Sequence, residues 1–392
     1  MISAYIVAGR SALIATIATA FGAAAVAAEL PTDTKEIKHL TVEEAKRLAD
    51  TFPGVPVGSE DRFCARGLPL QGLKIVDADV AKALSGYRGN AILLTGLTTI
   101  DADAAEAFAG FSGAVFVPVA VQQEFIRRNP LNAKTACMHA AVLKGDLTSV
   151  TTLEADTAKA LARFKGYSLM LHDVTSLDAD TARALAEFQG GMLSLCGLRT
   201  LDAAAARALA EFKGTVLDLR GLDALDADTA KALATYKCGD LLLDGLRTLD
   251  ADTAKELVKF RGHLHLSGLA AINADTATVL AGAKAKTLCL SGLTSLDADT
   301  AKALTAIEKW NGNLPSITAI DSVDSVAIAQ ALAARKGPLS LPNLKRISPK
   351  TLSALIEKQD VELPLIETLE LIPEPDGSPT EDFVIPEAFQ KK

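Results

Sequence analysis

Apolar and polar positions repeat along this chain with a period of about 24 residues. The segment Leu177–Leu185 (Leu-Asp-Ala-Asp-Thr-Ala-Arg-Ala-Leu) recurs at Leu201, Leu225, Leu249, Ile272 and Leu296, at offsets of 24, 24, 24, 23 and 24 residues. Upstream copies begin at Val76, Ile100 and Leu153, weaker ones near Leu40 and Leu131, and downstream ones near Val323 and Ile347. Related units therefore cover most of residues 40–370, which predicts a repeat architecture.

The first half of each unit has the pattern of a short helix. Ala182, Leu185 and Phe188 recur at near-helical spacing and give one narrow apolar face. Asp178 is placed to cap the helix, since its carboxylate can accept hydrogen bonds from the free N–H groups of the first turn. We expect Gly190 to end the helix in a left-handed conformation.

The second half of each unit alternates between leucine and other residues, as in Leu193–Leu198 and Leu217–Leu222. Period two over four or five residues predicts a short strand with one buried face. A single strand and a single short helix cannot bury their own apolar faces, so the units must stack. The sequence therefore predicts an α/β solenoid with a parallel sheet on one face, short helices on the other and a continuous Leu/Ala core.

Two segments carry a resemblance to a known family. Leu264-x-Leu266-x-x-Leu269-x-x-Ile272 and Leu288-x-Leu290-x-x-Leu293-x-x-Leu296 resemble the strand motif of bacterial leucine-rich-repeat proteins with short helices. The resemblance spans about residues 65–345 and implies a leucine-rich-repeat-like solenoid. That family usually has Asn or Cys where this chain has Leu269 or Leu293. We therefore expect the family's side-chain ladder to the loop backbone to be missing.

The pattern divides the chain into four parts. Residues 1–28 are expected to be a signal peptide, 29–75 an N-terminal cap with an insertion over Gly54–Arg66, and 76–370 the leucine-rich-type solenoid. Residues 114–150 break the period, because one interval is stretched to 31 residues, and a bulge or bend is expected there. Residues 371–392 are rich in proline and acidic residues and are expected to form a tail over the last repeat.

The N-terminal segment has the features of an export signal. Met1–Arg10 carries one positive residue, Ser11–Ala28 is uncharged and apolar, and the segment ends in small residues. The alternative is an uncleaved anchor, because about 18 apolar residues is the lower limit for spanning a bilayer. We expect cleavage and a periplasmic, extracellular or cell-surface location. No later segment is long and apolar enough to predict a membrane span in the mature chain.

Composition narrows the classes of function. The chain is 49% hydrophobic but only 5% aromatic, which favours thin, regularly stacked layers. The net charge is −8 and no basic block is present, so nucleic acid is not expected as a partner. Of the five cysteines, Cys196 and Cys289 lie on strands about 19 Å apart at ~4.8 Å per repeat, too far for a disulfide. Free thiols are expected.

The solvent side of the predicted sheet is the candidate binding surface. Helix positions repeat almost verbatim, whereas the strand residues between the inward-pointing leucines vary from repeat to repeat. Such variation indicates a recognition surface, although neutral drift of exposed positions is the alternative. One column of outward residues is Met170, Ser194, Asp218, Leu242, His265 and Cys289, and the next is His172, Cys196, Arg220, Asp244, Ser267 and Ser291. The candidate ligand-binding residues are Asp218, Arg220, Asp244, His172, His265, Ser267 and Ser291.

A metal site is the sharpest chemical alternative on this face. Period two places His263 and His265 on the same side of one strand, with Asp240 beside His263 on the preceding repeat and Cys289 beside His265 on the following one. Two imidazoles, a carboxylate and a thiolate could supply the three or four ligands that zinc requires. The alternative is a pair of solvated histidines on an exposed strand.

Other patterns of catalysis are weak. His172 and Cys196 are neighbours that could form a base and a nucleophile, but no orienting acid is placed beside the histidine. The Asp-Ala-Asp triplets are explained as helix caps and lack the spacing of calcium-binding EF-hand loops. We therefore expect no enzyme activity and no cofactor. The leading hypothesis is an exported, non-catalytic binding module that presents the sheet face to a protein or cell-envelope ligand. The alternatives are a structural spacer without a specific ligand and a metal-dependent hydrolase at His263 and His265.

Overall fold

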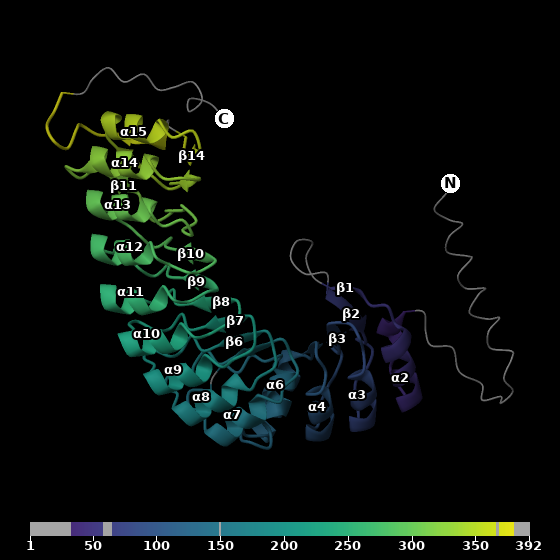
Figure 1. Cartoon of the computed structure of the whole chain (residues 1–392). Coiled ribbons are helices and arrows are strands. Elements are labelled where there is room, and N and C mark those ends of the chain that lie inside the picture. Colours follow the sequence, from purple (N-terminus) through teal and green to yellow (C-terminus); the bar gives the residue numbers. More distant parts are fainter. Residues whose placement is uncertain (1–32, 58–64, 149, 366–367, 380–392) are drawn as a thin grey trace, which may run out of the picture.

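The computed structural model describes residues 33–57, 65–148, 150–365 and 368–379. The chain forms a curved α/β solenoid in which short helices lie along the outer side of an arc and short strands lie along the inner side (Figure 1). The repeat architecture and the fold class predicted from the sequence are thus confirmed. The expected signal peptide, residues 1–28, lies outside the described residues.

The helices follow the predicted repeats closely. Their bounds are η1 Thr34–Glu36, α2 Val42–Thr51, α3 Ala78–Leu84, α4 Ala102–Phe108, α5 Val119–Arg128, α6 Ala136–Val142, α7 Ala155–Leu161, α8 Ala179–Ala186, α9 Ala203–Leu209, α10 Ala227–Leu233, α11 Ala251–Leu257, α12 Ala274–Leu280, α13 Ala298–Thr305, α14 Ser325–Ala333 and α15 Pro349–Ile356. Most of them begin at the predicted capping residue. The Asp178 carboxylate, for example, accepts a hydrogen bond from Thr181 N at 2.7 Å.

The strands are two to five residues long. Their bounds are β1 Val55–Val57, β2 Ala65–Pro69, β3 Ala91–Leu93, β4 Ala114–Phe116, β5 Ser168–Met170, β6 Met192–Ser194, β7 Val216–Asp218, β8 Asp240–Leu242, β9 His263–His265, β10 Thr287–Cys289, β11 Ala319–Ile320, β12 Leu339–Ser340, β13 Arg346–Ile347, β14 Val361–Glu362 and β15 Glu370–Leu371. Strands β5 to β10 form a parallel sheet with one strand from each repeat. We call one strand with its following turn and helix a rung.

The predicted insertion near the N-terminus extends the first sheet. Strands β1 and β2 pair in antiparallel orientation, with Val55 opposite Gly67, and β2 to β4 then continue as parallel strands. The described parts of Gly54–Arg66 therefore belong to the sheet edge.

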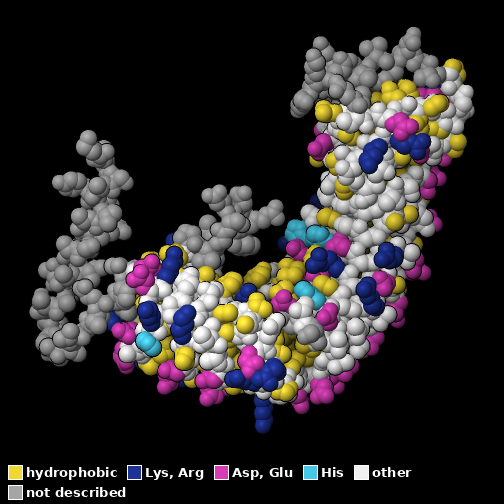
Figure 2. Space-filling view, turned by 180° about the vertical axis from the view of Figure 1, so that it is seen from behind, with side chains coloured by type: hydrophobic (Ala, Val, Ile, Leu, Met, Phe, Trp, Pro, Cys, Tyr) yellow, Lys and Arg dark blue, Asp and Glu magenta, His cyan; other side chains and the backbone are white. Residues whose placement is uncertain are grey.

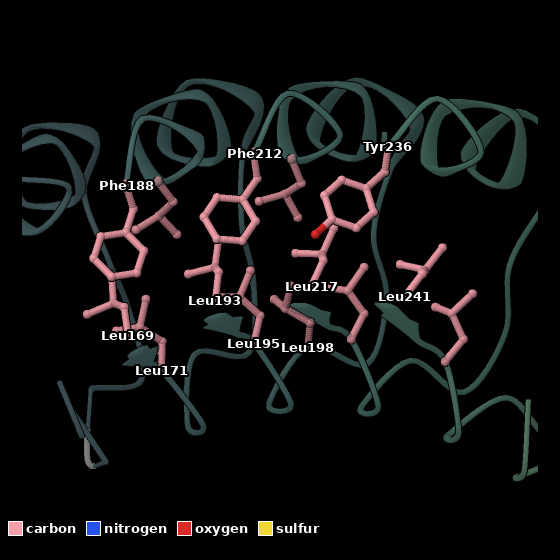
Figure 3. Close-up of a cluster of buried hydrophobic side chains, with 14 of the residues drawn as sticks. Leu169, Leu171, Phe188, Leu193, Leu195, Leu198, Phe212, Leu217, Tyr236 and Leu241 are labelled. Carbon is pink, nitrogen blue, oxygen red and sulfur yellow. The ribbon is translucent and has the colours of Figure 1, made fainter. Parts of the chain in front are cut away.

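Aromatic rings form a continuous column through the core of the central rungs. Phe164, Phe188, Phe212, Tyr236 and Phe260 stack with centroids 6.2–6.5 Å apart and nearly parallel planes. Figure 3 shows part of this column under the helices, with strand leucines pointing toward the rings. All five side chains are buried. Because each ring contacts the next rung, the column ties successive repeats together.

The expected role of Gly190 is wrong. Helix α8 ends at Ala186, and Gly190 does not have a positive φ. A Cβ atom built on Gly190 would instead lie 2.2 Å from Phe188 Cζ. The glycine is therefore required because the aromatic column passes close to the backbone, and Gly214 meets Phe212 in the same way.

A threonine ladder connects the helices to the preceding loops. Thr229, Thr253, Thr276 and Thr300 are buried, and each hydroxyl donates to a loop carbonyl about one repeat upstream, at Leu201, Leu225, Leu249 and Ile272 respectively. The O–O distances are 3.2–3.5 Å. Leucine does occupy the loop positions where Asn or Cys is usual, but a side-chain ladder to the loop backbone nevertheless exists. It comes from the first turn of the helix.

The period breaks where the sequence predicts a bulge or bend. Strand β4 is the last strand of the first sheet and β5 the first of the second, so the sheet is interrupted between them. The intervening segment forms α5 and α6. We call residues 117–147 the elbow. Within it, His139 is 3% exposed and its ring packs edge-on against Phe125 at 5.5 Å.

The C-terminal rungs replace the aromatic column with buried polar groups. The Arg335 side chain lies over the Trp310 ring at 5.0 Å and donates to the carbonyls of Trp310, Lys336 and Pro338. The beginning of the expected tail packs on the last helix. Glu374 is 5% exposed and accepts hydrogen bonds from Ser348 Oγ and Lys350 N at 2.8 and 3.0 Å. The prediction that the tail covers the last repeat therefore holds for this residue, and residues 380–392 lie outside the described part.

Two further expectations concern the thiols and the membrane. Cys137, Cys196, Cys238 and Cys289 are free, as predicted, and Cys64 is outside the described residues. Within the described ranges, no helix combines the length and the apolar character that crossing a bilayer requires.

Candidate functional site

The candidate site is the inner, concave face of the sheet formed by β5 to β10. The strand register confirms the predicted column, because Met170, Ser194, Asp218, Leu242, His265 and Cys289 are successive partners. A parallel column contains Ser168, Met192, Val216, Asp240, His263 and Thr287. Leu217 and Leu241, which lie between these columns, are fully buried. The alternation of the strand therefore directs both columns away from the core.

Asp218 and Arg220 form the most organised polar cluster on this face. The Arg220 Nε and Nη2 atoms donate to the two Asp218 carboxylate oxygens at 2.9 and 2.8 Å, a bidentate pair. Asp218 also accepts hydrogen bonds from Ser194 Oγ at 2.9 Å and Cys196 Sγ at 3.3 Å. The carboxylate is thus held from both neighbouring sides of the face.

The expectation that Asp218 contacts a ligand directly is wrong for this arrangement. Its side chain is fully buried, whereas half of the Arg220 side chain is exposed. Burial raises the pKa of Asp218, but the hydrogen bonds from Arg220 and Ser194 outweigh it and hold the pKa below its ordinary value. The same hydrogen bonds to Asp218 raise the pKa of Arg220. Asp218 therefore acts as a positioning residue, and Arg220 is the group offered to a partner.

The proposed base and nucleophile do not form a pair. Cys196 is the register neighbour of His172, but its thiol contacts Ser194 Oγ at 3.0 Å and Asp218. Burial raises the pKa of Cys196, and the Asp218 charge raises it further. Because the thiolate is the reactive form, these surroundings disfavour a nucleophilic cysteine.

Asp244 lies one rung beyond Arg220 in the second column. One of its oxygens, Oδ1, accepts a hydrogen bond from Ser267 N at 2.8 Å. Asp244, Ser267 and Ser291 are each half-buried on the concave face. The structure thus brings together Arg220, Asp244, Ser267 and Ser291 as a row along neighbouring rungs, and His172 lies at the other end of the same column.

His263 and His265 have the predicted neighbours. Asp240 is the register partner of His263, and Cys289 is the partner of His265. The Nδ1 atom of His263 forms a hydrogen bond with Thr287 Oγ1 at 2.7 Å. Across the described ranges, however, no three His, Cys, Asp or Glu side chains are grouped closely enough to hold a metal ion. Correct register therefore does not assemble the predicted metal site, because the side chains project in parallel from the sheet instead of converging.

The concave face also has an apolar part that the sequence analysis did not single out. Half-buried apolar side chains occupy its outward positions on β3 to β8, namely Leu93, Phe116, Met170, Met192, Val216 and Leu242. Figure 2 shows hydrophobic side chains gathered in the hollow of the arc, with histidine and charged side chains beside them. The signal was available in the first residue of each strand, which precedes the columns read from the sequence.

Comparisons with known proteins leave the residues themselves as the source of functional inference. No model of a known protein family matches this chain, and a search of curated proteins finds no significant match. The candidate site is therefore defined by its geometry alone.

Proposed function

We propose that this chain is an exported, non-catalytic binding module of leucine-rich-repeat type, and that its concave sheet face binds a protein or a cell-envelope component. Export is inferred from the composition of residues 1–28. The family assignment rests on the strand motif at Leu264–Ile272 and Leu288–Leu296, together with the stacked strand–helix rungs. The fold alone carries no particular ligand.

The Asp218–Arg220 pair is the observation that carries this proposal. Burying a carboxylate has a large desolvation penalty, which an ion pair does not always offset. The scaffold does not need a carboxylate at this position, because Leu242 occupies the equivalent position on the next rung. A buried Asp that fixes an exposed Arg with two hydrogen bonds therefore supports a binding role, in which a rigid guanidinium loses little entropy when a partner arrives.

A structural spacer is the second candidate. The aromatic column and the threonine ladder repeat from rung to rung, and such a framework gives length and rigidity without any specific contact. The spacer hypothesis leaves the Asp218–Arg220 pair without a purpose, so we favour binding.

Site-specific photo-crosslinking in cells distinguishes the two functions. A photoreactive amino acid is placed at Ser291 on the concave face and, in a matched control, at the exposed Lys255 on α11. We expect a discrete crosslinked partner from position 291 and none of the same mass from position 255. Crosslinking that is equal at both positions, or absent from both, would contradict the binding function and favour the spacer.

A further inference from the structure

We infer that the concave face binds an extended polypeptide segment in which an apolar side chain lies between two cationic ones. The inference rests on the proposed function and specifies the chemistry of the partner. The recognition element is strand β8 with the following residues, where Asp240, Leu242 and Asp244 all face outward. Leu241 and Leu243 alternate with them and are fully buried.

The spacing of the two carboxylates fits an extended partner. Asp240 and Asp244 are four residues apart along an extended chain, which corresponds to about 13 Å at ~3.3 Å per residue. Leu242 lies midway between them and is half-buried. A partner segment in extended conformation that runs along β8 presents every second side chain to this face. Lys or Arg at its positions i and i+4 would then meet the two carboxylates, and an apolar residue at i+2 would meet Leu242.

The charge of the two carboxylates is not neutralised by cationic side chains of the described residues. The ion pairs found there include none to Asp240 or Asp244, whereas Asp218 is paired with Arg220. The hydrogen bond from Ser267 N involves only Oδ1 of Asp244. Burial raises the pKa of Cys289, and both carboxylates raise it further, which shows that their negative field extends over this part of the face. A cationic partner complements that field.

The surroundings of this element favour a partner with an apolar side chain. Val216 is the register partner of Asp240, and Met192 is the partner of Val216, so half-buried apolar surface adjoins the acidic element on one side. His263 and His265 adjoin it on the other side. Burying apolar area supplies affinity, while the two charge contacts fix the register of the partner.

Histidine signals provide the test, because His263 and His265 flank the element and the chain has only five histidines. The full chain, labelled with 13C at the imidazole Cε1, is titrated at fixed pH with the blocked peptide Gly-Lys-Thr-Leu-Thr-Lys-Gly. The comparison peptide Gly-Glu-Thr-Leu-Thr-Glu-Gly has the same length and apolar residue. We expect the lysine peptide to move the signals of His263 and His265, to leave the buried His139 unchanged, and to bind at least ~10-fold more tightly than the glutamate peptide.

Two matched double variants locate the charge effect. The concave variant Asp240→Asn/Asp244→Asn should reduce the affinity for the lysine peptide to that for the glutamate peptide. The control variant Asp228→Asn/Asp252→Asn removes the same charge from exposed positions on α10 and α11 and should retain the binding. Equal binding of the two peptides, or undiminished binding by the concave variant, would overturn the inference.

Other occupants of the face give different signatures, each of which would also overturn the inference. Signals of His263 and His265 that move with protein concentration in the absence of peptide would assign the face to a second copy of this chain. Signals that move when residues 380–392 are deleted would assign it to the chain's own C-terminal segment. A crosslinked partner at position 291 together with no peptide preference would refute the cationic segment and leave the proposed binding function intact.

Discussion

The central rungs and the elbow solve the same packing problem in opposite ways. In the central rungs, each contact is repeated: aromatic rings stack on aromatic rings from Phe164 to Phe260, and threonine hydroxyls bond to the preceding loops. In the elbow, each contact occurs once. His139 Nε2 is hydrogen-bonded to the Asn129 carbonyl oxygen at 2.5 Å, and the Lys144 ammonium lies 4.4 Å from the centroid of the Phe116 ring.

The difference shows how a solenoid changes its course. Lys144 has a φ of 56°, and it is the only described non-glycine residue with a positive φ. A lysine in this conformation is less favourable than a glycine, so surrounding contacts must hold it. Repetition spreads stabilisation over many equivalent contacts, whereas the elbow depends on a few unique ones. Substitutions should therefore have graded, transferable effects in the central rungs and idiosyncratic ones in the elbow.

The largest expected effect is the loss of a ring from the aromatic column. Phe212→Ala removes a buried ring that stacks on both neighbours, and should lower the free energy of unfolding of the surrounding rungs by about 3–5 kcal/mol. Urea unfolding of the full chain measures the global loss. Hydrogen exchange in α8 to α10, followed by mass spectrometry, measures the local loss, which matters because repeats need not unfold together.

Phe212→Tyr is the matched control. Tyr236 shows that the column accepts a tyrosine, because its hydroxyl donates to the Gly214 carbonyl at 2.6 Å. The Gly190 carbonyl is equivalently placed one rung earlier, so the new hydroxyl should find an acceptor and change stability by no more than about 1 kcal/mol. A tyrosine variant as unstable as the alanine variant would show that the rungs are not equivalent.

These residues also show how far the sequence predicts the fold. The 24-residue period, the capping aspartates and the alternating leucines determine the stacking, because each is a local pattern repeated many times. The period did not reveal that Gly190 is needed for the close approach of the Phe188 ring, since that contact depends on three-dimensional proximity. In the elbow, only the failure of the period was visible. The burial of His139 and the backbone of Lys144 follow from contacts that no repeat announces.

An intermediate effect is expected in the elbow, and it depends on pH. His139→Leu removes the hydrogen bond to the Asn129 carbonyl and should lower the free energy of unfolding at pH 8 by about 1–3 kcal/mol. Burial lowers the pKa of His139 below its ordinary value of 6.5, although the hydrogen bond to Asn129 opposes the shift. Below pH 6.5, the unfolded chain therefore binds a proton that the folded chain does not. This group thus makes the wild-type protein less stable as the pH falls from about 7 toward the folded pKa.

The leucine variant lacks this titration, so the difference in stability between wild type and variant should narrow from pH 8 to pH 5.5. Urea unfolding at pH 8, 6.5 and 5.5 measures the difference. A central-rung substitution such as Phe212→Ala serves as the control, because its effect should stay constant over this range. A gap that widens on acidification would mean that His139 is protonated in the folded state.

The candidate site was predicted in position but not in detail. Register alone placed Asp240 beside His263 and Cys289 beside His265, because a parallel sheet with a constant period leaves no other choice. Side-chain direction decided the rest. Asp218 turned out to be buried under Arg220, since the long arginine side chain folds back onto the carboxylate two residues earlier. The sequence also could not show that the histidines and Asp240 project in parallel and leave no metal site.

The smallest expected effect tests whether the threonine ladder is as repetitive as the aromatic column. Thr229→Ala removes a hydroxyl that donates to the Leu201 carbonyl at 3.3 Å, and should cost about 0.5–1 kcal/mol. The chain itself offers the reverse experiment, because Ala205 occupies the corresponding position of α9. Ala205→Thr should restore a rung of the ladder by reaching the Leu177 carbonyl and should be neutral or slightly stabilising. Hydrogen exchange in α9 and α10 measures both. If threonine destabilises position 205 by more than its loss destabilises position 229, the ladder is a property of particular rungs, and the central region is less uniform than its sequence period indicates.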